Sequence, residues 1–166
     1  MTENVDILLI LGIFITMLLS AFFSGMEIAF ISGNRMLFEM DKEENGLSTR
    51  IIDLFYRRPN DFVSTMLVGN NIVLVVYGIM IAKLFNTTIF SGMDATFTVT
   101  ADTVLSTLIV LFTGEFLPKT LFKSNPNRLL KFFSPLAYLF YVLLWPISRF
   151  TTFLSKAILH ALGVKL

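Results

Sequence analysis

Three long apolar stretches alternate with polar, charge-rich stretches along this chain of 166 residues. The first runs from Ile7 to Phe23, the second from Phe62 to Phe85, and the third from about Thr103 to Leu121. Each approaches or reaches the roughly 20 residues that a helix needs to cross the hydrocarbon core of a bilayer. The pattern therefore predicts an all-α membrane protein with three transmembrane helices, over about residues 6–28, 62–85 and 103–122.

The polar stretch between the first two spans carries an amphipathic pattern. Apolar residues recur at helical spacing from about residue 33 to residue 58, and an Asn45-Gly46 pair interrupts them. This pattern predicts one or two amphipathic juxtamembrane helices. The stretch between the second and third spans, Asn86 to Asp102, is short, polar and free of Lys and Arg, so we expect a loop there.

After the third span, residues 128–162 hold a shorter apolar run. This run, Phe132 to Ile147, is framed by Pro135 and Pro146. It is short for a membrane crossing, and its prolines disfavour a straight helix, so we expect juxtamembrane structure in the form of an interfacial helix or a helical hairpin. A fourth span is the alternative.

Composition places the chain among membrane proteins. It is 55% hydrophobic and 15% charged, whereas soluble domains are about 45–50% apolar and about 25% charged. The net charge of +1 gives no support for nucleic-acid binding. With no Cys and a single His, His160, the core can hold neither a thiolate or multi-histidine metal site nor a Ser/His/Asp triad. We therefore expect that the protein is not an enzyme. The membrane composition and the length predict a single transmembrane domain over residues 1–166.

The distribution of Lys and Arg predicts the orientation in the membrane. The segments after the first and third spans are basic, whereas the N-terminus and the stretch after the second span lack Lys and Arg. Because cytoplasmic loops carry the excess of positive charge, we expect the N-terminus outside and, with three spans, the C-terminus in the cytoplasm. The first span is not expected to be a cleaved signal peptide, because no positive segment precedes it.

The third span carries four unusual residues near its predicted cytoplasmic end: Gly114, Glu115, Pro118 and Lys119. A carboxylate at membrane depth costs roughly 2.5–3.5 kcal/mol, so Glu115 should face protein, water or an ion. Pro118 lacks an N–H group and clashes with the carbonyl group four residues earlier, so we expect a loosened backbone with free carbonyl oxygens beside Glu115. Carboxylate and carbonyl oxygens are ligands for a hard cation. The alternative is a structural ion pair between Glu115 and Lys119.

The other two spans place polar groups at a similar depth. They are Ser20, Ser24 and Glu27 in the first span, and Ser64, Gly69, Asn70 and Asn71 in the second. Close helix packing is the alternative explanation for the serines and glycines, and an interhelical hydrogen bond is the alternative for the asparagines. As ligands, hydroxyl, amide and carboxylate oxygens suit Mg²⁺, Ca²⁺ or Mn²⁺. A single carboxylate suits an ion that must leave again, so the sequence predicts a cation pathway that opens to the cytoplasm.

Three motifs also resemble one known family. SAFFSGMEIAF in the first span, STMLVGNN in the second, and GEFLPKTL with the following NP are similar to the transmembrane domain of the CNNM/CorC magnesium transport proteins, from about Leu8 to Pro146. The resemblance implies a homodimer in a bacterial or archaeal plasma membrane, with three membrane helices per subunit and a cytoplasmic belt of juxtamembrane helices. It also implies a Mg²⁺ site in a cytoplasm-facing cavity and sodium-linked export of magnesium.

Carried over by motif, the resemblance implies a set of site residues. The ion would be held by Ser20 or Ser24, Asn70 and Glu115, with Gly114 beside them, and Glu27, Ser64, Gly69, Asn71, Pro118 and Lys119 would support or gate the site. Which serine and which asparagine touch the ion stays open at this point.

The C-terminal end departs from the family pattern. Members usually continue into a cytoplasmic CBS-pair module, whereas this chain stops at Leu166, which indicates either a truncated protein or a membrane-only relative. A CBS-pair module is therefore an expected partner only in a longer form. Two functions follow: magnesium export, or a membrane scaffold that senses Mg²⁺ without transporting it.

Overall fold

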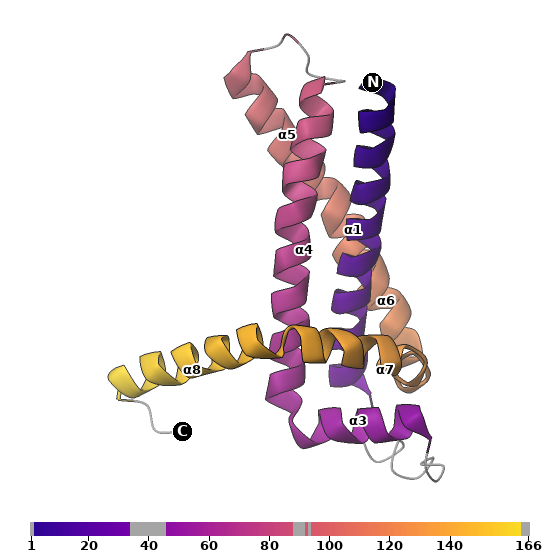
Figure 1. Cartoon of the computed structure of the whole chain (residues 1–166), viewed down its shortest axis with the longest axis vertical. Helices are drawn as coiled ribbons and strands as arrows, with labels where there is room; N and C mark the ends of the chain where they lie inside the picture. The colour runs from indigo at the N-terminus through magenta and orange to yellow at the C-terminus, as the bar shows by residue number, and fades with distance from the viewer. Residues whose placement is uncertain (1, 34–45, 88–91, 93, 164–166) are drawn as a thin grey trace. The chain divides into compact units, whose positions relative to one another are not determined.

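The computed structural model describes residues 2–33, 46–87, 92 and 94–163, which are almost entirely helical and contain no strand. Three helical segments are long and apolar enough to span a membrane, which confirms the all-α class and the three predicted spans (Figure 1). They are α1 (Thr2–Ser32), α4 (Pro59–Thr87), and a third segment made of α5 (Ala95–Val110), the π-helix η1 (Leu111–Phe116) and α6 (Leu117–Ser124). The remaining helices are α3 (Leu47–Arg57), α7 (Pro126–Leu143) and α8 (Trp145–Ala161).

The third segment begins earlier than the sequence pattern predicts. We expected a loop up to Asp102, but α5 already begins at Ala95, so the second half of that expectation is wrong. Thr98 and Thr103 explain why polar residues fit this helix, because their hydroxyl groups donate hydrogen bonds to the backbone carbonyls four residues earlier, at 2.9 and 2.8 Å. These bonds satisfy the hydroxyl groups within the helix.

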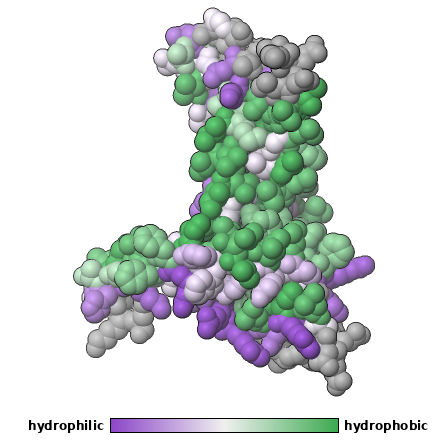
Figure 2. All heavy atoms as spheres, viewed as in Figure 1, coloured by the Kyte–Doolittle hydropathy of each residue, from purple (hydrophilic) through white to green (hydrophobic). Residues whose placement is uncertain are grey.

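The chain divides into two compact units. Unit 1 comprises residues 1–25 and 70–121, and unit 2 comprises residues 26–69 and 122–166. Unit 1 is built around a buried cluster of Ile13, Tyr77, Ile81 and Phe85. Hydrophobic side chains cover the visible outer face of its helices (Figure 2), and many of them are exposed, such as Phe14, Leu108 and Phe112. A helix bundle with an apolar exterior is suited to a lipid environment.

Unit 2 is held together by aromatic rings. Phe55 of α3 lies 4.3 Å from Phe62 and 5.6 Å from Tyr141 of α7, measured between ring centroids. Phe30 stacks on Tyr56 at 4.9 Å. The buried face of α3 and its N-terminal boundary at Gly46 agree with the amphipathic helix predicted after the Asn-Gly pair. The part of that prediction covering residues 34–45 lies outside the described residues.

The C-terminal part of unit 2 forms two helices rather than one. Helices α7 and α8 meet at Leu144 with a bend of 66°. Pro135 lies inside α7, where it cannot donate a hydrogen bond to the carbonyl of Lys131. The hydroxyl group of Ser134 donates to that carbonyl instead, at 2.9 Å, so the helix continues through the proline. As a bent pair, α7 and α8 are compatible with interfacial helices and with one broken fourth span.

Candidate cation site

A buried polar cluster lies where the three span segments of unit 1 meet. The hydroxyl group of Ser20, from α1, donates a 2.7 Å hydrogen bond to the Oδ1 atom of Asn70, from α4. Ser20 is fully buried and Asn70 is 7% exposed. A buried amide or hydroxyl group without a partner would cost about 1–3 kcal/mol, so this bond matters for how the two helices are aligned.

The third segment reaches the same cluster through Gly114. A Cβ atom placed on Gly114 would lie 2.8 Å from the Oγ atom of Ser20 and 3.3 Å from Cγ2 of Val110. Real Cβ contacts are essentially never as short as the first of these distances. Only glycine therefore lets the backbone of η1 approach the Ser20 hydroxyl group this closely.

The backbone around Glu115 is widened, as Pro118 predicts. Residues Leu111–Phe116 form a π-helix, and the N–H group of Leu117 bonds to the carbonyl of Phe112, five residues earlier. Pro118 then has no N–H group to offer the carbonyls of the same turn. Single turns of π-helix are frequent at functional sites in proteins. Glu115 therefore lies within a widened turn of the third segment.

Glu115 itself lies on this turn with its side chain half-buried. In the part of the chain that the structure describes, it forms no ion pair with Lys119, which is exposed. The alternative reading of Glu115 as half of a structural ion pair is therefore not supported by the structure. Pro118 is buried one turn after Gly114.

The remaining predicted residues fall into three groups. Ser24 is buried in unit 1, one turn after Ser20 on the same face of α1. Asn71 is exposed on α4, so its side chain does not share the buried environment of Asn70. Glu27, Ser64 and Gly69 belong to unit 2, where the first two are half-buried and the third is buried.

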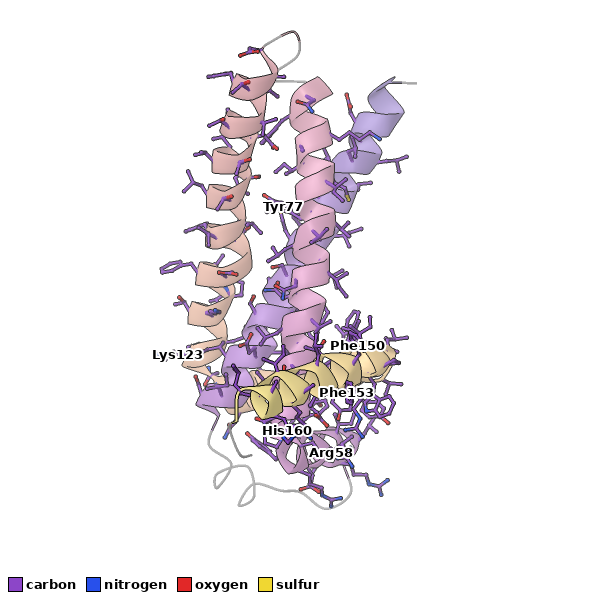
Figure 3. All side chains as sticks on the ribbon, turned by 90° about the vertical axis from the view of Figure 1, so that its left-hand side faces the viewer. Arg58, Tyr77, Lys123, Phe150, Phe153 and His160 are labelled. Atoms are coloured by element: carbon purple, nitrogen blue, oxygen red, sulfur yellow. The ribbon has the colours of Figure 1, made fainter. Side chains whose placement is uncertain are left out.

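Sequence reasoning missed one acidic residue of the third segment. Asp102 was assigned to a loop, but it lies inside α5, and its Oδ1 atom is buried without a hydrogen-bond partner among the described residues. Nearby, the hydroxyl group of Tyr77 donates to the backbone carbonyl of Ser106 at 3.0 Å, and Figure 3 shows Tyr77 projecting from α4 toward α5. Extending the apolar run backwards through Phe97 and Val99 would have placed Asp102 inside a helix.

The polar atoms of this cluster are oxygen atoms of the kind that hard cations prefer. Within the described ranges, no group of three or more His, Cys, Asp or Glu residues could hold a metal ion. The available donors are the Ser20 hydroxyl and Asn70 amide oxygens, which both keep a free lone pair when bonded to each other. Oxygen donors of this kind suit Mg²⁺ and Ca²⁺ rather than zinc or copper.

Comparison with known proteins gives the family. Residues 11–166 match the family model described as the CNNM, or cyclin M, transmembrane N-terminal domain. The chain belongs to the CNNM family. It is accordingly a multi-pass membrane protein of a metal-ion transport family, and the resemblance drawn from the three motifs is confirmed.

Several relatives of this CNNM domain are bacterial proteins. The chain is 28% identical over 152 residues to the UPF0053 protein MG146 of Mycoplasma genitalium, covering 89% of the chain and 35% of that protein. It is 25% identical over 147 residues to the UPF0053 inner membrane protein YfjD of Escherichia coli, covering 89% of the chain and 33% of the relative. A UPF0053 protein of Haemophilus influenzae is 27% identical over 157 residues, with 92% and 35% covered. The chain thus spans about a third of the length of these relatives.

Proposed function

We propose that this domain exports Mg²⁺ across the membrane, with the ion held by oxygen atoms of Ser20, Asn70 and Glu115. The observation that carries the proposal is the meeting of the three span segments at one buried point, through the Ser20–Asn70 hydrogen bond and the close approach of Gly114. Family membership supports metal-ion transport as the general activity. Mg²⁺ as the cargo and sodium as the coupled ion are the specific parts of the proposal.

The three residues would have different roles in binding and releasing the ion. Ser20 and Asn70 supply neutral oxygens that are already oriented toward each other by their hydrogen bond. Glu115 supplies one negative charge from the widened turn. Mg²⁺ gives up its water reluctantly, and one carboxylate among neutral oxygens holds it weakly enough for release.

The widened turn also offers a place for movement. A π-helical turn next to a proline has fewer backbone hydrogen bonds to break than a regular helix, so η1 is the part of unit 1 best suited to change conformation. We propose that this change alternates access to the ion, from a cavity that opens to the cytoplasm. In this arrangement the N-terminus lies outside and two copies of the chain form the working dimer.

The test is Mg²⁺ efflux from liposomes that contain the purified protein. Asn70→Ala should remove most of the flux, because it deletes a donor oxygen, whereas the matched control Asn71→Ala should retain it, because Asn71 is exposed on the same helix. Glu115→Gln should also abolish flux while keeping the shape of the side chain. Equal flux in Asn70→Ala, Glu115→Gln and the unaltered protein would overturn the site.

A membrane scaffold that senses Mg²⁺ is the second candidate function. The same close contact of Ser20 with Gly114 would let a bound ion set the packing of the three segments without any transport. Saturable Mg²⁺ binding without flux in the same liposomes would select the scaffold over the transporter. Flux through the unaltered protein that Asn70→Ala removes together with Mg²⁺ binding would select the transporter.

A further inference from the structure

A second polar site lies in unit 2, at the beginning of α7. It is a cavity of about 730 Å³, and its lining combines basic, polar and aromatic side chains: Ser124, Asn125, Arg128, Leu129, Lys131, Phe132 and Phe133. Nothing in the proposed transport function uses these residues. Ser124 is also the last residue of the third candidate span, so the cavity begins where that span ends.

The charged side chains that line this cavity are both positive. Arg128 and Lys131 are both exposed, and neither forms an ion pair with any residue in the described ranges. No Asp or Glu follows Glu115 anywhere in the sequence, whereas Lys and Arg recur to the C-terminus. An unbalanced pair of cations in a cavity attracts an anion.

The aromatic part of the lining favours an amphipathic anion. Phe132 is 74% exposed, although it packs edge-on against Phe133 with ring centroids 4.9 Å apart. Phe133 in turn stacks on Phe122 at 5.5 Å. Such exposure is unfavourable in water but favourable among acyl chains. The N-terminal turn of α7, where the Asn125 side chain makes no capping hydrogen bond, adds backbone N–H groups that suit an anionic oxygen.

We infer that this cavity binds the headgroup of an anionic phospholipid. Arg128 and Lys131 contact the phosphate group, and Phe132 lies against the upper part of the acyl chains. Basic cavities at the end of a membrane span are typical positions for acidic headgroups. The bound lipid would anchor the start of α7 at the membrane surface. This site does not depend on the identity of the transported ion.

The test measures binding of phosphatidylglycerol and of neutral phosphatidylcholine to the purified chain in an uncharged detergent. We expect phosphatidylglycerol to bind more tightly, and Arg128→Gln/Lys131→Gln to weaken it about 10- to 30-fold, as expected for the loss of two cations near the headgroup. The matched control is Arg149→Gln/Lys156→Gln, which removes the same two residue types from α8, outside the cavity. The control should stay within about twofold of the unaltered protein, because its residues do not line the cavity.

A further variant separates a lipid from a soluble phosphate. Phe132→Ser should weaken phosphatidylglycerol binding while leaving any competition by inorganic phosphate unchanged. Equal binding of the two lipids, or equal losses in the cavity and control variants, would overturn the inference. Displacement of the lipid by millimolar inorganic phosphate with no effect of Phe132→Ser would overturn it in favour of a soluble anion. Because Arg128, Lys131 and Phe132 are exposed, these variants should fold.

Discussion

Gly114→Ala tests whether the close approach of the third segment builds the candidate cation site. The new methyl group would lie 2.8 Å from the Ser20 Oγ atom, so something must shift, and rotation of the Ser20 side chain would break its hydrogen bond with Asn70. Overpacking costs about 1–3 kcal/mol, and losing the hydrogen bond costs about 0.5–1.5 kcal/mol. Alanine returns up to about 1 kcal/mol through its higher helix propensity. We therefore expect a net loss of about 2 kcal/mol.

Thermal unfolding in detergent, with and without Mg²⁺, measures both consequences. For a chain of this length, 1 kcal/mol shifts Tm by about 2–4 °C, so the variant should unfold about 4–8 °C lower. At a Mg²⁺ concentration 100 times Kd, the ion should stabilise the unaltered protein by about 2.7 kcal/mol. A tenfold weaker site would give only about 1.4 kcal/mol at the same concentration, so the Mg²⁺-induced shift should fall to about half.

Gly78→Ala is the matched control. Gly78 also lies in a span of unit 1, but a Cβ atom there would meet nothing within 4 Å. This variant should keep the full Mg²⁺-induced shift and gain up to about 1 kcal/mol from helix propensity. If Gly114→Ala behaves like Gly78→Ala in both stability and Mg²⁺ response, the three segments do not form a tight site at Ser20, and the reasoning is refuted.

Two further predictions concern single polar groups outside the cluster. Ser134→Ala removes the hydroxyl group that bonds the carbonyl of Lys131, so it should lower stability by about 1 kcal/mol; an unchanged Tm would show that the carbonyl has another donor. Asp102→Asn replaces a carboxylate whose buried Oδ1 atom has no hydrogen-bond partner among the described residues. It should raise stability by about 1 kcal/mol, and a fall in Tm or in Mg²⁺ flux would instead assign Asp102 a functional role.

The sequence predicts the spans well because each apolar run is long and interrupted by few charges. The second span begins three residues earlier than predicted, because Pro59, Asn60 and Asp61 are not apolar, although Pro59 occupies the first position of α4. The length of the third span is underestimated because its first residues include several threonines, which are polar in the sequence. Their hydroxyl groups donate hydrogen bonds to carbonyls of their own helix. The pattern of apolar and polar residues does not show which hydroxyl groups form hydrogen bonds within their own helix.

The candidate site was predictable in its residue types but not in its geometry. The widened turn beside Glu115 agrees with the local effect expected of Pro118, which lacks an N–H group. The sequence does not show that Asn70 rather than Asn71 is buried. Adjacent helix positions differ by about 100°, and the rotation of α4 depends on its packing with two other segments. The cavity at the start of α7 likewise depends on how its side chains pack, which periodicity does not reveal.

The double variant Ser20→Ala/Asn70→Leu separates a packing role of the cluster from a binding role. Ser20→Ala alone leaves the Asn70 Oδ1 atom without its hydroxyl donor, which should cost about 1–3 kcal/mol. Replacing both partners by apolar groups of similar shape is nearly neutral, so the double variant should unfold within a few degrees of the unaltered protein. It nevertheless lacks both neutral donor oxygens, so the Mg²⁺-induced rise in Tm should disappear. A double variant that keeps both its stability and its Mg²⁺ response would show that this buried pair only packs the helices together.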